Sequence, residues 1–243
     1  MLTRDQWRRL GLWGLLLNTA NANRVAYGLP TTWVPHTLGN TLGLALPEIV
    51  DAADAALGRL APGSVSLTAL RAAAQEVTSE PRGWARTMAP ITLAYVVSHP
   101  DFNIYRGELG EVRCLGFGLD SIPHSLTAAA LTMLVYDGLT ALHTHTPSEA
   151  AIAPLVEAGY RQRVGLAALI LAGLTAFYEY SEYSIHQAEL RATGGDESRI
   201  NMMWDAEDTA KDVASNGLGW LAATLVHLAR TRRAVATPGP ALA

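Results

Sequence analysis

Apolar residues along this chain gather in long runs that short polar segments interrupt. The runs and their proline and glycine boundaries predict helices. Pro47 and Pro90 should kink their helices, because proline removes a backbone donor and clashes with the preceding turn. The predicted long helices are Trp7–Ala22, His36–Leu60, Trp84–Val97, Leu119–His143, Arg161–Leu190 and Ser198–Arg230. With no repeat and no convincing sheet, the pattern predicts an all-α helical bundle of about six helices in a single domain, residues 1–243.

The segments between these helices are polar and broken by turn residues. Leu67–Val77 should form an amphipathic helix, and residues 101–116 an irregular segment with a strand-like hairpin. A loop and a short helix follow residue 144, and Gly194 and Gly195 separate the last two long helices. The end of the chain, residues 232–243, has the composition of a disordered tail.

Composition leaves two classes of helical protein open. Charged residues make up only 16% of the chain and the mean hydropathy is +0.14, which fits a membrane protein with short, polar-lined spans or a very apolar soluble bundle. The apolar runs, about 14 to 20 residues each, stand at the lower limit for crossing a bilayer. The net charge of −4 gives no case for nucleic acid. The single Cys114 excludes an internal disulfide framework and a cysteine-based zinc site.

The arginines favour the membrane protein. If six helices span a membrane and both termini are cytoplasmic, 12 arginines lie in cytoplasmic segments and 5 outside, and Lys211 completes the 18 basic residues. This excess is what the positive-inside rule requires. The segment His36–Leu60 fits a span least well, because Glu48, Asp51 and Asp54 lie along it. We interpret the N-terminal apolar stretch as a retained first helix, since no good cleavage site follows it.

Acidic residues and histidines recur at helical spacing at the predicted outer ends of three helices. Residues three, four or seven apart share one face of a helix, so each group forms a stripe. Carboxylates and histidines that converge from neighbouring helices can bind a divalent metal ion. The predicted metal ligands are Asp120, His124, Glu179, Glu182, His186, Asp205, Asp208 and Asp212.

Other interpretations of the acidic residues and histidines remain open. The acids could serve as polar contacts between helices, or as a proton or cation relay. Asp137, in the middle of a predicted helix, should face the bundle interior, because a charge there is costly. His143 and His145 point apart on a helix, so an exposed loop pair is favoured over a ligand set.

Three motifs resemble the YjdF-like family of uncharacterised bacterial inner-membrane proteins. They are Asp120-x-x-x-His124, Glu179-x-x-Glu182 and Asp208-Thr209-x-x-Asp212-x-x-x-Asn216-x-x-Gly219, and the resemblance covers about residues 116–220. It implies a multi-pass helical membrane protein with a polar site. The family has no settled activity to carry over.

The leading functional expectation is a metal-dependent enzyme that acts on a lipid-linked or hydrophobic substrate near the outer face of the membrane. Glu182 or Asp208 would be the catalytic base or a metal ligand. One alternative is a non-catalytic accessory or scaffold subunit, with membrane lipids and a membrane protein as partners. The other is a soluble all-α protein with a metal-carboxylate centre.

Overall fold

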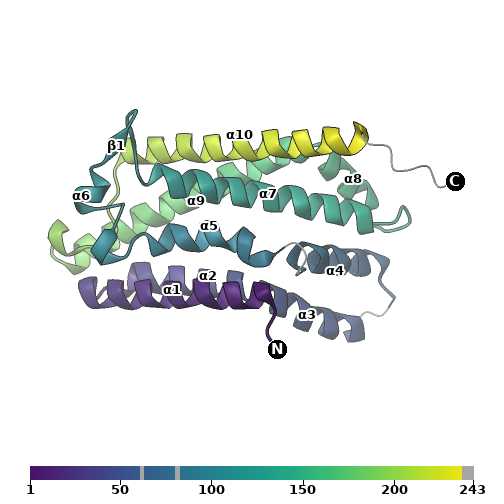
Figure 1. Cartoon of the computed structure of the whole chain (residues 1–243), viewed down its shortest axis with the longest axis horizontal. Helices are drawn as coiled ribbons and strands as arrows, with labels where there is room; N and C mark the ends of the chain where they lie inside the picture. The colour runs from purple at the N-terminus through teal and green to yellow at the C-terminus, as the bar shows by residue number, and fades with distance from the viewer. Residues whose placement is uncertain (61–62, 80–82, 237–243) are drawn as a thin grey trace.

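Helices that alternate in direction form the bundle seen in the computed structural model, which describes residues 1–60, 63–79 and 83–236 (Figure 1). The long helices are α1 (Arg4–Tyr27), α2 (Pro30–Leu44), α5 (Trp84–Val96), α7 (Ser121–His145), α9 (Arg163–Ala192) and α10 (Ala206–Ala236). At one end lie α3 (Leu46–Leu60), α4 (Val65–Thr78) and α8 (Ala153–Arg161). At the other lie η2 (Pro100–Phe102), α6 (Gly107–Gly110), β1 (Arg113–Cys114), β2 (Phe117–Gly118) and η3 (Glu197–Arg199). The all-α prediction is confirmed.

Helix α7 occupies the centre of the bundle, where it packs against α4, α5, α8, α9 and α10. Small residues let α7 and α10 approach closely. A Cβ atom added to Gly219 would lie 2.1 Å from the carbonyl oxygen of Ser125 and 2.9 Å from Cβ of Ala128. The hydroxyl of Ser125 also donates to the carbonyl of Ser215 over 2.9 Å. Glycine at position 219 is therefore required by the distance between the two helices.

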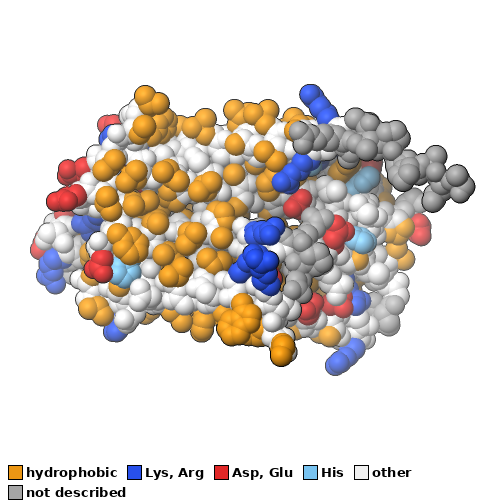
Figure 2. Space-filling model, viewed as in Figure 1, with side chains coloured by type: hydrophobic (Ala, Val, Ile, Leu, Met, Phe, Trp, Pro, Cys, Tyr) orange, Lys and Arg blue, Asp and Glu red, His pale blue; other side chains and the backbone are white. Residues whose placement is uncertain are grey.

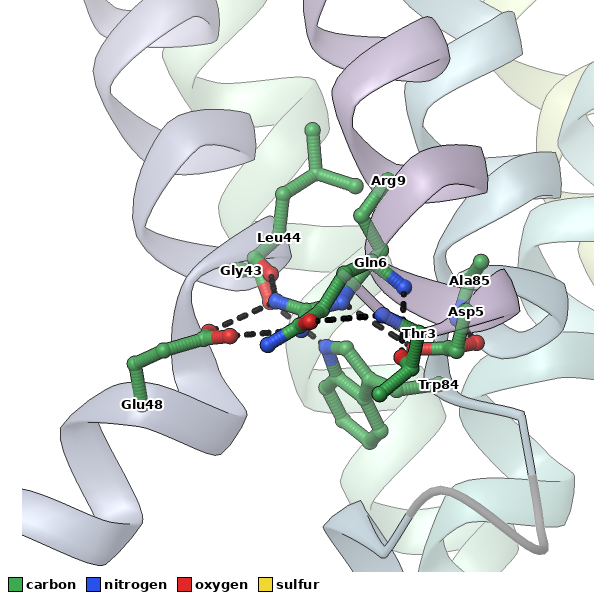
Figure 3. A network of polar contacts seen from close by, with 9 residues as sticks. All are labelled: Thr3, Asp5, Gln6, Arg9, Gly43, Leu44, Glu48, Trp84 and Ala85. Carbon is green, nitrogen blue, oxygen red and sulfur yellow. Dashed lines mark hydrogen bonds and ion pairs between the residues drawn. The ribbon is translucent and has the colours of Figure 1, made fainter. Parts of the chain in front are cut away.

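The second predicted helix is two helices instead of one kinked helix. Helix α2 ends at Leu44 and α3 begins at Leu46. Pro47 cannot donate to the carbonyl of Gly43, and the Nε1 of Trp84 donates to that carbonyl instead, at 2.7 Å. The Arg9 guanidinium donates to the carbonyl of Leu44, also at 2.7 Å. Side chains from α1 and α5 thus satisfy the backbone groups at the break (Figure 3).

Arg9 joins three helices at this break. Its guanidinium contacts Asp5 at 3.1 Å and both carboxylate oxygens of Glu48 at 2.6 Å, and its side chain is 10% exposed. The other oxygen of Asp5 accepts the backbone N–H of Ala85 at 3.0 Å. Figure 3 shows the network as one cluster between α1, the α2–α3 break and the start of α5. Arg9 is one of the 12 arginines predicted to lie in cytoplasmic segments, and the structure shows in addition that it is buried and paired.

Several predicted helix ends differ from the observed ones. Helix α1 begins earlier, because Thr3 and Gln6 form a capping box, and it ends at Tyr27, where the next residue, Gly28, caps it with a φ of 72° that suits glycine. Helix α10 begins at Ala206 instead of Ser198, which lies in η3. It continues to Ala236, so the first five residues of the predicted tail are helical, and the others lie outside the described residues. A hairpin is present as β1 paired antiparallel with β2, and its second strand lies just beyond the predicted segment 101–116.

Two helices, α7 and α9, are long and apolar enough to cross a membrane, judged by length and composition over the described residues. The prediction of six such helices is not confirmed by this criterion. Many large apolar side chains are nevertheless exposed, and Figure 2 shows a broad apolar band between charged groups at the left end and an arginine-rich patch right of centre.

Candidate functional site

A cavity of about 220 Å³ lies between α2, α5, α7, α9 and α10, close to the end that carries the hairpin. Its walls combine apolar side chains with a group of titratable ones. Among the predicted ligands, those that line the cavity are Asp120, His124, Glu179, Glu182, Asp208 and Asp212. Three helices that are separate in sequence therefore bring their polar stripes to one place.

Three carboxylates stand closest together. Glu179, Glu182 and Asp212 each offer one oxygen, and these oxygens lie within 4.8 Å of one another. The Oε2 atom of Glu179 accepts a hydrogen bond from the hydroxyl of Thr209 at 2.7 Å. Asn216 donates to the hydroxyl of Thr175 at 3.2 Å, which adds a second link between α9 and α10. Like charges this close repel one another unless protons or a cation neutralise them.

Asp212 is the most buried member of the cluster, at 5% exposure. Its Oδ1 lies 3.3 Å from Nε2 of His124. That contact lacks hydrogen-bond geometry, and the same oxygen has no hydrogen-bond partner among the residues that the structure describes. A buried carboxylate oxygen without a hydrogen bond is costly, so Asp212 is suited to a positively charged ligand.

Asp120 and Asp208 complete the acidic lining. Asp120 caps α7, and its carboxylate accepts the N–H of Ser121 at 2.8 Å. A Cβ atom at Gly118 would lie 2.3 Å from that carboxylate, so glycine leaves it room. Asp208 lines the cavity one turn before Asp212 on α10 and is half-buried. The two acids stand beside the three-carboxylate cluster.

Two predicted ligands do not line the cavity. His186 is buried, and its Nδ1 lies 3.0 Å from the carbonyl of Met202, which it helps to hold in place. Asp205 is exposed and precedes α10, where one of its oxygens accepts the N–H groups of Glu207 and Asp208 at 2.8 and 2.9 Å. Helical spacing predicted both residues in the cluster, but hydrogen bonds to backbone groups use their side chains instead.

Glu189 is a residue that the sequence reasoning missed. It is 1% exposed, and its carboxylate accepts the N–H groups of Asn201 and Met202 at 2.7 and 2.9 Å and the hydroxyl of Thr31 at 2.6 Å. Glu189 follows Glu182 by seven residues, so the same spacing could have found it. It fixes the loop that supplies Asn201, Met202 and Met203 to the cavity wall.

Tyr105 and Arg106 also line the cavity, from the segment between η2 and α6. The Tyr105 hydroxyl donates to the carbonyl of Ala94 at 2.8 Å. Burial, together with the charges of Glu182, Asp120 and Asp212, raises the pKa of Tyr105 well above its ordinary value. The tyrosine is therefore a neutral hydrogen-bond donor at any physiological pH.

His143, His145 and Asp137, which the sequence analysis also singled out, do not line the cavity. His143 and His145, in the last turn of α7, each contact a glutamate at 2.8 Å, Glu157 and Glu76 respectively. The expectation of an exposed loop pair is therefore wrong, because these rings connect α7 to α8 and α4. Asp137 is half-buried, and its carboxylate lies close enough to His227 of α10 for the two side chains to interact electrostatically.

Comparisons with known proteins find no match to this chain. No protein-family model matches the chain, and no curated protein and no solved structure matches it. The resemblance to the YjdF-like family is not tested by these comparisons and stays a prediction. The function has to be inferred from the geometry and chemistry of the cavity.

Proposed function

We propose that this chain is a membrane-embedded helical protein whose cavity binds a divalent cation and uses it to act on a lipid-linked or hydrophobic substrate. The observation that carries the proposal is the close approach of Glu179, Glu182 and Asp212, combined with the buried Oδ1 of Asp212 that has no hydrogen-bond partner among the described residues. In this proposal both termini lie in the cytoplasm, as the arginine distribution predicts.

The exposed apolar surface supports the membrane part of the proposal. Only 22% of the most apolar window of α7 and 11% of that of α9 is buried in the protein. The core helix of a soluble protein would be mostly buried, so these helices suit a lipid environment better than water. Large exposed apolar side chains on the other long helices include Trp7, Leu10, Trp13, Leu15, Leu17, Leu38, Leu42, Val213, Leu218, Leu221, Leu225 and Val226.

The chemistry of the ligand atoms indicates which cations fit. Carboxylate oxygens without cysteine suit hard divalent ions such as Mg²⁺, Mn²⁺ or Ca²⁺. Three carboxylates from two helices form an incomplete coordination shell, which leaves positions for water or substrate. A cation here would also relieve the repulsion between the three acids.

Asp208 and His124 supply the proton chemistry in this proposal. Glu182 and Asp212 are metal ligands in this proposal. Asp208, the other acid of α10 in the cavity, takes the role of general base. His124, 3.3 Å from Asp212, is placed to orient that carboxylate or to protonate a leaving group. The cation would supply electrophilic activation when bound.

Cation binding to the detergent-extracted membrane fraction tests the proposal. After removal of metal with EDTA, the wild-type protein should bind one Mn²⁺ per chain. Glu182→Gln and Asp212→Asn should each weaken binding by about tenfold or more, because each loses a charged ligand worth about 1.5–3 kcal/mol. Glu207→Gln is the matched control, since this side chain of α10 is 82% exposed and pairs with Lys211 outside the cavity.

Three results would contradict the proposal. Recovery of folded protein in the soluble fraction without detergent would remove the membrane part. Unchanged Mn²⁺ affinity in both cavity variants would remove the metal site. Loss of stability in these variants, from a wild-type protein that binds no metal, would favour the accessory subunit, whose acids serve helix packing.

A further inference from the structure

The cavity reaches the surface at an apolar place. Its charged lining residues are all buried or half-buried. Among the lining residues that the structure describes, the exposed ones are Tyr178 and Met203, at 49% and 43%. An opening for a water-soluble substrate would be expected to expose polar groups, because these favour a hydrated entrance. This opening exposes an aromatic ring and a thioether.

The position of Tyr178 on α9 shows which way the opening faces. Residues of α9 that line the cavity follow helical spacing and form one inward stripe: Leu171, Leu174, Thr175, Tyr178, Glu179 and Glu182. Tyr178 belongs to this stripe and is still half exposed, so no neighbouring helix covers α9 there. The opposite stripe, with Leu169 and Phe177 at 71% and 64% exposure, faces outward in the ordinary way.

Tyr178 lies on the edge of the inward stripe that is turned away from α10, and α2 is the neighbour of α9 that lies nearest to this edge. The other edge of the inward stripe is occupied by α10, through Thr209 to Glu179 and Asn216 to Thr175. Near its C-terminal end α9 is tied to α2 by the hydrogen bond from Thr31 to Glu189. From there α9 crosses the bundle obliquely (Figure 1). Between the two helices the cavity wall comes from His36 and Asn40 of α2 and from Ile91 and Ala94 of α5.

We propose that this opening between α2 and α9 is a lateral portal for the hydrocarbon chain of a single lipid substrate. The proposal rests on the function proposed above, which it extends by naming the substrate class and its route. The polar group of the lipid lies at the carboxylate cluster, and the chain passes Leu174, Tyr178 and Met203 to the bilayer. A hydrocarbon chain loses little by moving from lipid into an apolar passage, whereas a hydrated substrate would lose its water there.

Photocross-linking of lipid in proteoliposomes tests the portal. The probe is a phosphatidylethanolamine with a diazirine in one acyl chain, and mass spectrometry locates the modified residues. Cross-links are expected on the inward residues Leu174 and Ile91, in addition to the outward residues Leu169 and Phe177 that contact bulk lipid. Cross-links confined to the outward residues in the wild-type protein would overturn the portal.

Matched substitutions on α9 separate portal entry from general lipid contact. Leu174→Trp fills the passage and should lower cross-linking at Ile91 by roughly tenfold. Leu169→Trp places the same bulk on the outward face and should leave cross-linking at Ile91 unchanged. Equal cross-linking at Ile91 in both variants would contradict the proposal, because the passage would then not run past Leu174.

Mn²⁺ binding to the same proteoliposomes distinguishes failure of the portal from failure of the metal site. Inward cross-links without Mn²⁺ binding would support the portal and contradict the metal-dependent function. Mn²⁺ binding without inward cross-links would contradict the portal and support the metal site.

Discussion

Arg9 shows how the structure uses a charge that the sequence alone assigns only to the arginine excess of the cytoplasmic segments. The residue follows Arg4 and Arg8 in an arginine-rich segment, and nothing in the sequence distinguishes it from them. Besides Asp5 on the same helix, its partners lie at the α2–α3 break, 35 to 39 residues away in sequence. The guanidinium hydrogen bonds lower the pKa of Glu48. The Arg9–Glu48 pair therefore stabilises the folded protein fully at pH values above the ordinary pKa of a glutamate. This stabilisation is lost as the pH falls through the lowered pKa of Glu48.

Replacement of Arg9 by methionine should destabilise the protein by about 2 kcal/mol. The change leaves Asp5 with a buried, unpaired charge and removes a donor from Leu44, while the exposure of Glu48 reduces the cost below that of a fully buried pair. The measurement is the midpoint of thermal unfolding in detergent near pH 7. Arg8→Met, at an exposed neighbouring position, is the control and should leave the midpoint unchanged. An equal midpoint in both variants would contradict this account of the break.

At the scale of elements, the contact between α7 and α10 decides whether the cavity forms. His124 and Asp212 lie on these two helices, and the 3.3 Å between them depends on the close approach at Gly219. The Ser125 hydroxyl bond to the carbonyl of Ser215 fixes the rotation of the two helices at the same level. The packing of small residues thus positions one wall of the candidate metal site.

Gly219→Ala should separate α7 from α10 and weaken Mn²⁺ binding. The added methyl group would meet the backbone of Ser125 at 2.1 Å, so the helices must move apart at a cost of about 1–3 kcal/mol. Gly217→Ala is the matched control, because Cβ at that position meets no atom within 4 Å. It should stabilise the protein slightly through helix propensity. Thermal unfolding and Mn²⁺ affinity together measure both variants, and a harmless Gly219→Ala would refute the argument.

At the scale of the whole molecule, the apolar runs were sufficient to predict the long helices and their order. They could not predict the break after Leu44, because it depends on Trp84 and Arg9, whose side chains reach it only in the folded bundle. A proline in a helix gives the same sequence signal whether it kinks the helix or ends it. The start of α10 was missed for a local reason, the capping by Asp205.

Helical spacing predicted the acidic residues that line the cavity, and it failed where a side chain had another use. It brings Glu179 and Glu182 to one stripe, and the structure places both at the cavity. It cannot show that His186 contacts the carbonyl of Met202, since that loop has no periodic pattern. The α2 and α5 walls, such as His36 and Ile91, carry no chemical signal in the sequence and depend entirely on which helices become neighbours.

The central claim is that Glu179, Glu182 and Asp212 hold one divalent cation, and locating that ion is the most direct test. Crystals of the wild-type protein grown with Mn²⁺ should give an anomalous-scattering peak about 2.0–2.6 Å from one carboxylate oxygen of each residue. The peak should be absent from Asp212→Asn crystals grown under the same conditions. A manganese peak elsewhere, or an intact cavity without a peak at saturating Mn²⁺, would contradict the claim.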